Sequence, residues 1–161
     1  MIILIDGRSG SGKTELATLL ARRLSAQLVR LDDIYPGWDG LDAGSTAVPG
    51  ILESGRWRRW DWASSEPAEW HELDLARPVV VEGVGALSRA SGPLADHRLW
   101  VELDDRARKA RALARDQYYA PHWDRWAAQE ERFIEREQPR SLADTVVAGD
   151  AVEAFSLEWR P

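Results

Sequence analysis

The stretch GRSGSGKT, residues 7–14, has the composition and spacing of an anion-binding loop. It matches the pattern G-x-x-x-x-G-K-[ST] in full, and it stands between an apolar run and a segment with helical periodicity, as this motif requires. Its glycines let the backbone aim several N–H groups at one point, and the helix that follows adds the positive end of its dipole. A glycine-rich turn that binds no ligand is the alternative. We predict a phosphate site formed by Gly7, Arg8, Ser9, Gly10, Ser11, Gly12, Lys13 and Thr14.

Two side chains of this loop suit a nucleoside triphosphate. The ammonium group of Lys13 would neutralise charge on the β- and γ-phosphates, and the hydroxyl of Thr14 would be a magnesium ligand. Lysine is rare in this chain, since only Lys13 and Lys109 stand among 21 basic residues, so a lysine at this position is informative. A GTPase is disfavoured, because the chain has no asparagine for an N-K-x-D motif and contains no D-x-x-G. ATP and Mg²⁺ are therefore the expected cofactors, with GTP as the alternative phosphate donor.

Three carboxylates stand at the ends of apolar runs. Asp32 and Asp33 follow AQLVRL, residues 26–31, and Glu82 ends the run VVVE. Ligands of parallel sheets bind at the carboxyl ends of the strands. A carboxylate there can accept a proton from an acceptor hydroxyl or help to hold magnesium. The alternative is a structural role, as a turn or capping acid for Asp32 and especially Asp33, and as a buried strand-end cap for Glu82.

Patterns typical of strands and of helices alternate along the chain, and these elements must position the loop and the carboxylates. Apolar or β-branched runs predict strands at 1–6, 26–31, 78–83, 98–103 and 144–149. Helical spacing of apolar residues predicts helices at 13–24, 42–54, 104–118 and 122–138. The alternation predicts an α/β fold of three αβα layers, in which a five-stranded, mainly parallel sheet has helices on both faces. No linker divides residues 1–161, so we expect a single domain, and the segment 55–76 fits no clear pattern.

Four blocks of sequence, in matching order, resemble the uridine kinase-like nucleoside kinases, a group of the small P-loop kinases. The blocks are GRSGSGKT, LDDIY at 31–35, VVVEGVGAL at 79–87 and VELDDRARKARALARD at 101–116. The resemblance implies the P-loop NTPase fold and phosphoryl transfer from ATP. It also implies that Asp32 is the general base and a possible metal ligand, and that Glu82 stands near the magnesium ion together with Thr14.

The same resemblance assigns roles to three arginines of the last block. Arg108, Arg111 and Arg115 are spaced by three and four residues, so they share one face of a helix. They look like the family's lid arginines, which close over the transferring phosphate, and the lid region would span about residues 104–125. Arg108 and Arg111 would bind the nucleotide, and Arg111 and Arg115 would join Lys13 in catalysis. A solvated arginine face is the alternative.

The acceptor side, about residues 32–77, departs from the family. The family holds its nucleoside with a long segment that includes a hairpin, whereas only residues 62–78 fill that gap here. We therefore expect the contacts that hold the base and ribose to be largely absent and a nucleoside acceptor to be disfavoured. The stretch SGRWRRWDW, residues 54–62, offers Asp61 for acceptor hydroxyls, Trp57 or Trp60 as a pocket wall, and an arginine for an anionic group. Packing of these tryptophans on the core is the alternative. The expected substrate residues are Asp33, Tyr35, Trp38, Arg59, Trp60 and Asp61.

Charge and composition restrict the partners. The formal net charge of -6 opposes the counterion release that dominates nucleic-acid binding, so we expect no nucleic-acid partner despite the tryptophan–arginine stretch. No apolar run approaches the roughly 20 residues that cross a bilayer, and the opening MIILIDG has no basic stretch, so we expect neither a membrane partner nor a signal peptide. The lack of cysteine agrees with a reducing cytoplasm.

These observations predict an ATP- and Mg²⁺-dependent kinase that acts on a hydroxyl group of a small molecule. One alternative is a regulatory P-loop protein that binds nucleotide without transferring phosphate. Another is a small-molecule kinase of the gluconate or adenylate type.

Overall fold

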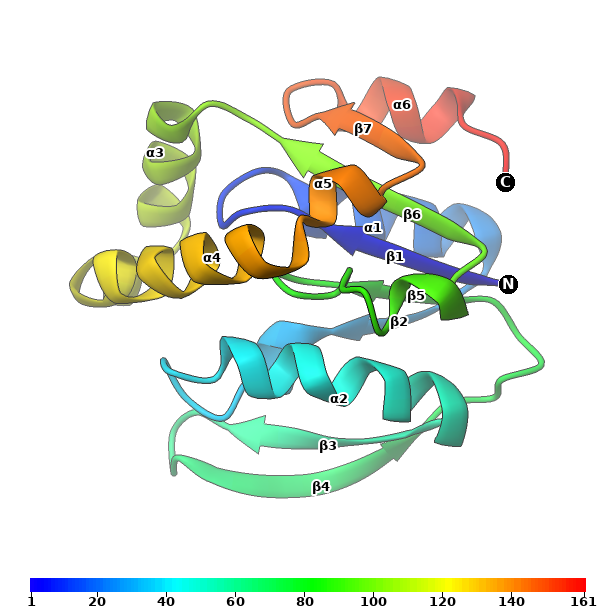
Figure 1. Cartoon of the computed structure of the whole chain (residues 1–161), viewed down its shortest axis with the longest axis horizontal. Coiled ribbons are helices and arrows are strands. Elements are labelled where there is room, and N and C mark those ends of the chain that lie inside the picture. The colour runs from blue at the N-terminus through cyan, green and yellow to red at the C-terminus, as the bar shows by residue number, and fades with distance from the viewer.

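Five parallel strands form the central sheet of the computed structural model, which describes all 161 residues (Figure 1). Their order across the sheet is β2-β5-β1-β6-β7, and every neighbouring pair is parallel. The predicted α/β class and parallel sheet are therefore confirmed. The strands are β1 (Ile2–Asp6), β2 (Gln27–Arg30), β5 (Val79–Glu82), β6 (His97–Glu102) and β7 (Thr145–Ala148).

Apolar side chains cover both faces of this sheet, because β1 and β5 carry continuous apolar runs at Ile2–Ile5 and Val79–Val81. In β1 the side chain of Leu4 joins one core cluster, whereas those of Ile3 and Ile5 join the other, and all three are fully buried. The two-residue period of a strand sends successive side chains to opposite faces. The sheet thus carries two cores and needs a helical layer on each side, as the predicted three αβα layers require.

The helices fill these two layers. The α1 and α6 helices pack in the cluster with Ile3, and α2 and α4 pack in the cluster with Leu4. The α-helices are α1 (Lys13–Leu24), α2 (Leu41–Ser54), α3 (Asp105–Arg115), α4 (Trp123–Glu137), α5 (Pro139–Leu142) and α6 (Val152–Glu158). Short 3₁₀ turns lie at η1 (Leu31–Asp33), η2 (Gly92–Leu94) and η3 (Gln117–His122). None of the helices is long and apolar enough to cross a membrane.

The α3 helix ends before the predicted boundary at residue 118. The backbone of Asp116 is extended, and its carboxylate accepts a hydrogen bond from the Tyr118 N–H, which starts η3. Pro121 follows within the same turn, and proline cannot continue a helix because it lacks an N–H group. A new turn therefore begins where the apolar spacing alone predicts a continued helix.

The unassigned segment folds as a β-hairpin of β3 (Arg56–Asp61) and β4 (Glu66–Glu72), which lies beside α2 (Figure 1). Trp57 is buried and stacks on His71 of the partner strand, with ring centroids 4.2 Å apart. A bulge between Arg58 and Trp60 shifts the register. The sequence predicts no element for this segment, because the bulge hides the strand's alternation.

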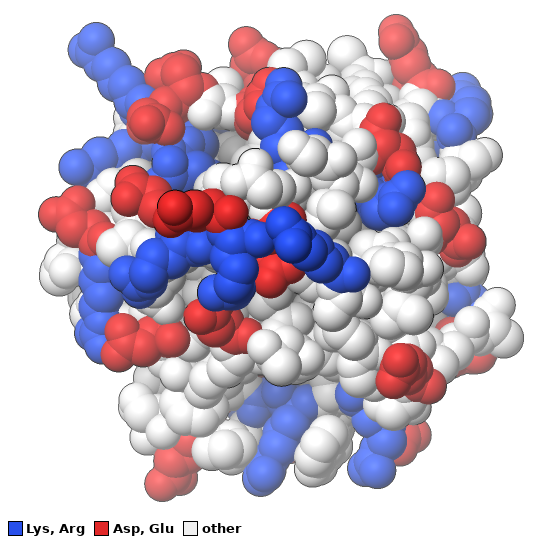
Figure 2. Space-filling view, in the orientation of Figure 1, with Lys and Arg blue, Asp and Glu red and all other residues white.

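Ion pairs tie α4 to the chain around the start of α2. Arg125 pairs with Asp39, and Arg136 pairs with Asp42 at 2.9 Å. Figure 2 shows acidic and basic side chains interspersed over this face. Exposed pairs of this kind each contribute little, roughly 0 to 1 kcal/mol.

Candidate functional site

The phosphate-binding loop predicted at residues 7–14 joins β1 to α1 at the carboxyl edge of the sheet. The geometry requires glycine at all three glycine positions of the loop, as Gly10 and Gly12 illustrate. Gly10 has φ +78°, and a Cβ atom there would lie 2.1 Å from the carbonyl oxygen of Arg108 in α3. Gly12 has φ +107° and stands directly before α1. The loop therefore combines left-handed backbone with close contact to a neighbouring helix, which only glycine permits.

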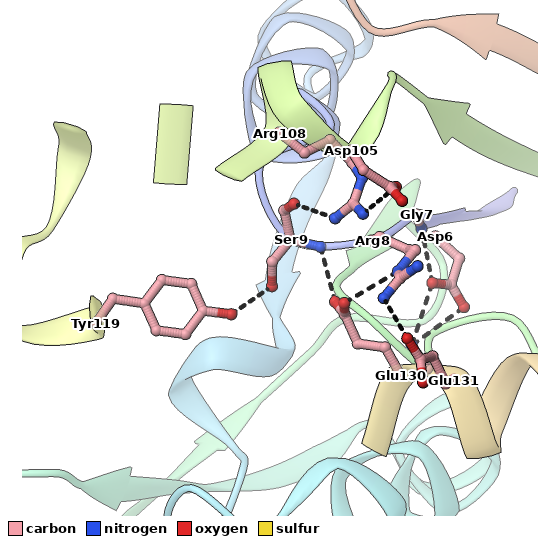
Figure 3. A network of polar contacts seen from close by, with 10 residues as sticks. Asp6, Gly7, Arg8, Ser9, Asp105, Arg108, Tyr119, Glu130 and Glu131 are labelled. Carbon is pink, nitrogen blue, oxygen red and sulfur yellow. Dashed lines mark hydrogen bonds and ion pairs between the residues drawn. The ribbon is translucent and has the colours of Figure 1, made fainter. Parts of the chain in front are cut away.

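Ser9 fixes this loop to the segments that follow β6 (Figure 3). Its N–H donates to Glu130 Oε2 at 2.8 Å, and its carbonyl oxygen accepts from Arg108 Nη1 at 3.0 Å. Its hydroxyl accepts a hydrogen bond from the Tyr119 hydroxyl at 2.7 Å. All three polar groups of Ser9 are thus engaged, by α4, α3 and η3 respectively.

Glu130 and Tyr119 are positioning residues that sequence reasoning missed. Glu130 is fully buried in α4 and also accepts from Arg8 Nε at 3.2 Å. A signal for Glu130 exists in the sequence, because it occupies the apolar stripe of α4 between Trp126 and Phe133. A carboxylate on such a stripe needs buried partners, and the loop supplies them.

Asp6, at the end of β1, is a second buried carboxylate that joins segments of the site. It accepts hydrogen bonds from the N–H groups of Gly7 at 2.7 Å, Gly85 at 3.1 Å and Leu87 at 2.9 Å. Burial raises the pKa of Asp6 to about 7, although these hydrogen bonds oppose the increase. Asp6 thereby holds the first residue of the loop against the segment that follows β5.

The side chains of Thr14 and Glu82 contact each other beside the loop. Glu82 ends β5 and is 1% exposed, and its Oε1 accepts a hydrogen bond from the Thr14 hydroxyl at 3.0 Å. Burial raises the pKa of Glu82, and the nearby charge of Lys13 lowers it in part. A buried carboxylate with one neutral donor retains acceptor capacity for a cation. This pair of oxygen donors fits Mg²⁺, which commonly uses one or two protein oxygens together with phosphates and water.

Two cavities open beside the loop. The first, of about 320 Å³, is lined by loop residues and by α3, including Gly10, Gly12, Thr14 and Arg111. The second, of about 300 Å³, is lined by aromatic side chains and by Asp32 and Asp116. Lys13 and Arg115 line both cavities. The two spaces therefore meet at a pair of cations.

The three arginines of α3 are placed differently. Arg108 is buried, lines neither cavity, and donates to the Ser9 carbonyl oxygen and to Asp105 at 2.5 Å, so its guanidinium holds the loop. Arg111 lines the first cavity and donates to the Gly149 carbonyl oxygen at 3.0 Å. Arg115 lies at the junction of the two cavities. Direct contact with nucleotide is therefore open to Arg111 and Arg115, whereas Arg108 acts through the loop.

The predicted substrate residues divide in two groups. Tyr35 and Trp38 line the second cavity, and the Tyr35 hydroxyl donates to the Val84 carbonyl oxygen at 2.6 Å. The other four, Asp33, Arg59, Trp60 and Asp61, lie outside its lining.

Contacts within the hairpin hold two of those residues away from the cavity. Arg59 pairs with Glu69 at 2.7 Å, and Asp61 caps the hairpin turn by accepting from the Ala63 N–H. Burial, and then the charge of Asp32, raise the pKa of Asp33. Instead of Trp57 or Trp60, the cavity is lined by Trp62, whose indole N–H donates to the Asp32 carbonyl oxygen at 2.8 Å.

The chain is similar over most of its length to several solved kinase structures. A possible uridine kinase from Bacillus stearothermophilus matches with a TM-score of 0.63 and 19% identity, over 91% of this chain and 88% of that one. A gluconokinase from Sinorhizobium meliloti matches with a TM-score of 0.56 and 18% identity, over 96% and 90%. Shikimate kinase from Acinetobacter baumannii, solved with shikimate, matches with a TM-score of 0.55 and 16% identity, over 96% and 89%.

The fold is that of the small P-loop kinases. No family model matches the chain. The predicted resemblance is thus confirmed at the level of the P-loop kinase fold. Since the neighbours named here act on different molecules, the substrate has to be inferred from the two cavities.

Proposed function

We propose that this protein is an ATP- and Mg²⁺-dependent kinase that transfers the γ-phosphate to a hydroxyl group of a small molecule. The observation that carries the proposal is the pair of cavities that meet at Lys13 and Arg115. A phosphate donor in the first cavity and an acceptor in the second would face each other across these cations. Kinases need this arrangement, because phosphoryl transfer depends on positioning and charge neutralisation.

The first cavity supplies the groups that a triphosphate needs. The loop N–H groups and the start of α1 face the phosphates, and Lys13 and Arg111 add positive charge. Thr14 and Glu82 would hold Mg²⁺, with Asp32 as a further ligand. When bound, the ion would neutralise phosphate charge.

The second cavity supplies the acceptor and its base. The oxygen of the acceptor hydroxyl forms a bond to the γ-phosphorus, and the bond from that phosphorus to the β,γ-bridging oxygen breaks. ADP leaves with the electron pair of the broken bond, and the carboxylate of Asp32 takes the hydroxyl proton. Arg115 and Lys13 stabilise the charge that spreads over the phosphoryl oxygens during transfer.

Acceptor-dependent ADP release from ATP and Mg²⁺ tests this proposal. A panel of nucleosides, sugars, vitamins and amino alcohols is assayed with the native protein and with Lys13→Ala and Asp32→Asn. We expect one acceptor class to stimulate turnover, Lys13→Ala to lose nucleotide binding, and Asp32→Asn to keep nucleotide binding while losing about 100-fold or more of its turnover.

Two results would contradict the proposal. Full transfer activity in Asp32→Asn would remove Asp32 as the base. Nucleotide binding through Lys13 with no stimulation by any acceptor would favour the regulatory alternative, in which the same loop binds nucleotide without transfer.

A further inference from the structure

Aromatic rings form half of the lining of the second cavity. Trp38 stands at the centre of this group: it stacks on His122 with centroids 4.2 Å apart and meets Trp62 edge to face at 5.2 Å. Because each ring packs against another, these walls are fixed before any ligand arrives. The rings that line the cavity are Tyr35, Trp38, Trp62, Tyr119 and Trp126.

On the side away from the loop, the charged side chains that line this cavity are acidic. Lys13 and Arg115 are shared with the first cavity, where bound phosphates would neutralise them. The remaining charged groups in the lining are the carboxylates of Asp32 and Asp116. With nucleotide in place, the acceptor would therefore meet acidic groups and aromatic rings.

Carboxylates close to this cavity add further negative charge. Burial is the main cause that raises the pKa of Tyr119, and the carboxylates of Glu130 and Asp32 raise it further. Two arginines nearby do not offset these acids, because Arg8 is paired with Glu130 and Arg108 with Asp105. The cations left to an anionic ligand group are Lys13 and Arg115, which would already face phosphate oxygens when nucleotide is bound.

We propose that the second cavity selects a cationic alcohol, a compound whose hydroxyl lies toward Asp32 and whose protonated amine or quaternary ammonium group lies among the aromatic rings near Asp116. Aromatic faces attract such cations, and an adjacent carboxylate adds to the attraction when water is excluded. The inference rests on the proposed function, because it takes this cavity as the acceptor site. It names the substrate class, which the shared fold leaves open.

Three benzyl alcohols that differ only in their para substituent test the proposed selectivity. They are 4-(aminomethyl)benzyl alcohol, which is a cation, 1,4-benzenedimethanol, which is neutral, and 4-(hydroxymethyl)benzoate, which is an anion. Their binding is measured by isothermal titration calorimetry to protein saturated with Mg²⁺ and a non-hydrolysable ATP analogue. We expect the cation to bind about tenfold more tightly than the neutral compound, and the anion to bind least.

Two variants and a control locate the effect. Asp116→Asn keeps a capping oxygen for η3 and removes the charge, so the cation should bind about fivefold more weakly while binding of the neutral compound stays unchanged. Trp62→Leu should also weaken binding of the cation by about fivefold. Trp70→Leu is the matched control, because Trp70 is 56% exposed on the hairpin and lines neither cavity.

Each outcome decides the inference. Preference for the cation that falls in both cavity variants and persists in Trp70→Leu supports it. Preference for the neutral or anionic compound, no binding by any of the three, or an equal loss in Trp70→Leu overturns it. Failure of the kinase proposal is seen separately, as failure of the ATP analogue to bind through Lys13 or as absence of acceptor-dependent ADP release.

Discussion

Gly10 shows how a single residue couples the loop at residues 7–14 to α3. A side chain at this position would meet the carbonyl oxygen of Arg108 at 2.1 Å, so the loop and the helix approach each other as closely as backbone allows. The same helix donates from Arg108 to the Ser9 carbonyl oxygen. The shape of the loop therefore depends on α3 as well as on its own glycines.

Gly10→Ala tests this dependence. We expect the binding of ATP to weaken by about tenfold or more, because either the loop or α3 must move to admit the methyl group. Gly37→Ala is the matched control, since Gly37 has a similar φ of +80° but no atom within 4 Å of the added carbon. Both variants should lose roughly 1 kcal/mol of stability from backbone strain, whereas calorimetry should show weaker nucleotide binding only in Gly10→Ala. Equal binding by the two variants would mean that the close approach to α3 has no effect on the loop.

Asp6 makes stability depend on pH. Burial raises its pKa from 3.8 to about 7, so between these values the folded protein holds a proton that the unfolded chain releases. The contribution of Asp6 to the free energy of unfolding is complete below pH 4 and is lost as pH rises through about 7, at a rate of at most about 1.4 kcal/mol per pH unit.

Urea unfolding of the native protein and Asp6→Asn at several pH values between about 4 and 8 measures this contribution. The free energy of unfolding of the native protein, minus that of the variant, should fall as pH rises. A difference that stays constant across this range would show that Asp6 is ionised throughout, as its three N–H donors favour.

The hairpin of β3 and β4 distributes its aromatic residues according to strand register. Trp57 pairs with His71 and Trp70 pairs with Arg58, so the two tryptophans stand one step apart in the register and on opposite faces, and the first is 9% exposed and the second 56% exposed. Trp57 packs in the core with Leu52 and stacks on His71, whereas Trp70 lies between Arg56 and Arg58 at the surface. The alternative interpretation of the tryptophans as packing residues therefore holds for Trp57.

Trp57→Ala and Trp70→Ala should thus differ in stability. We expect a loss of about 3 to 5 kcal/mol for Trp57→Ala, from the lost burial and the cavity left behind, and less than about 1 kcal/mol for Trp70→Ala. Chemical denaturation measures both. Similar losses in the two variants would indicate that the hairpin contributes to stability as a unit, without a dominant contact to α2.

Across the whole molecule, local patterns were sufficient to predict the sheet and the glycine-rich turn between β1 and α1. Continuous apolar runs mark buried parallel strands, and the loop motif is contiguous, so both can be recognised from neighbouring residues. The strand ends then bring the loop, Asp32 and Glu82 to one edge of the sheet, which the topology confirms.

Other parts of the site depend on contacts that sequence proximity does not reveal. Glu130 and Tyr119 reach Ser9 across 121 and 110 residues of chain, respectively. Trp62, which follows β3 directly, lines the second cavity, whereas Trp60 within the strand does not. These contacts depend on tertiary packing between elements that are distant in the sequence.

The tryptophans that line the second cavity also allow ligand binding there to be followed by intrinsic fluorescence. Trp38, Trp62 and Trp126 border that space, whereas no tryptophan borders the first cavity. Indole emission responds to the polarity around the ring, so a ligand that displaces water from the second cavity would change the intrinsic fluorescence. Nucleotide in the first cavity would touch none of these rings, so a change in their emission would report on the second cavity without any added label.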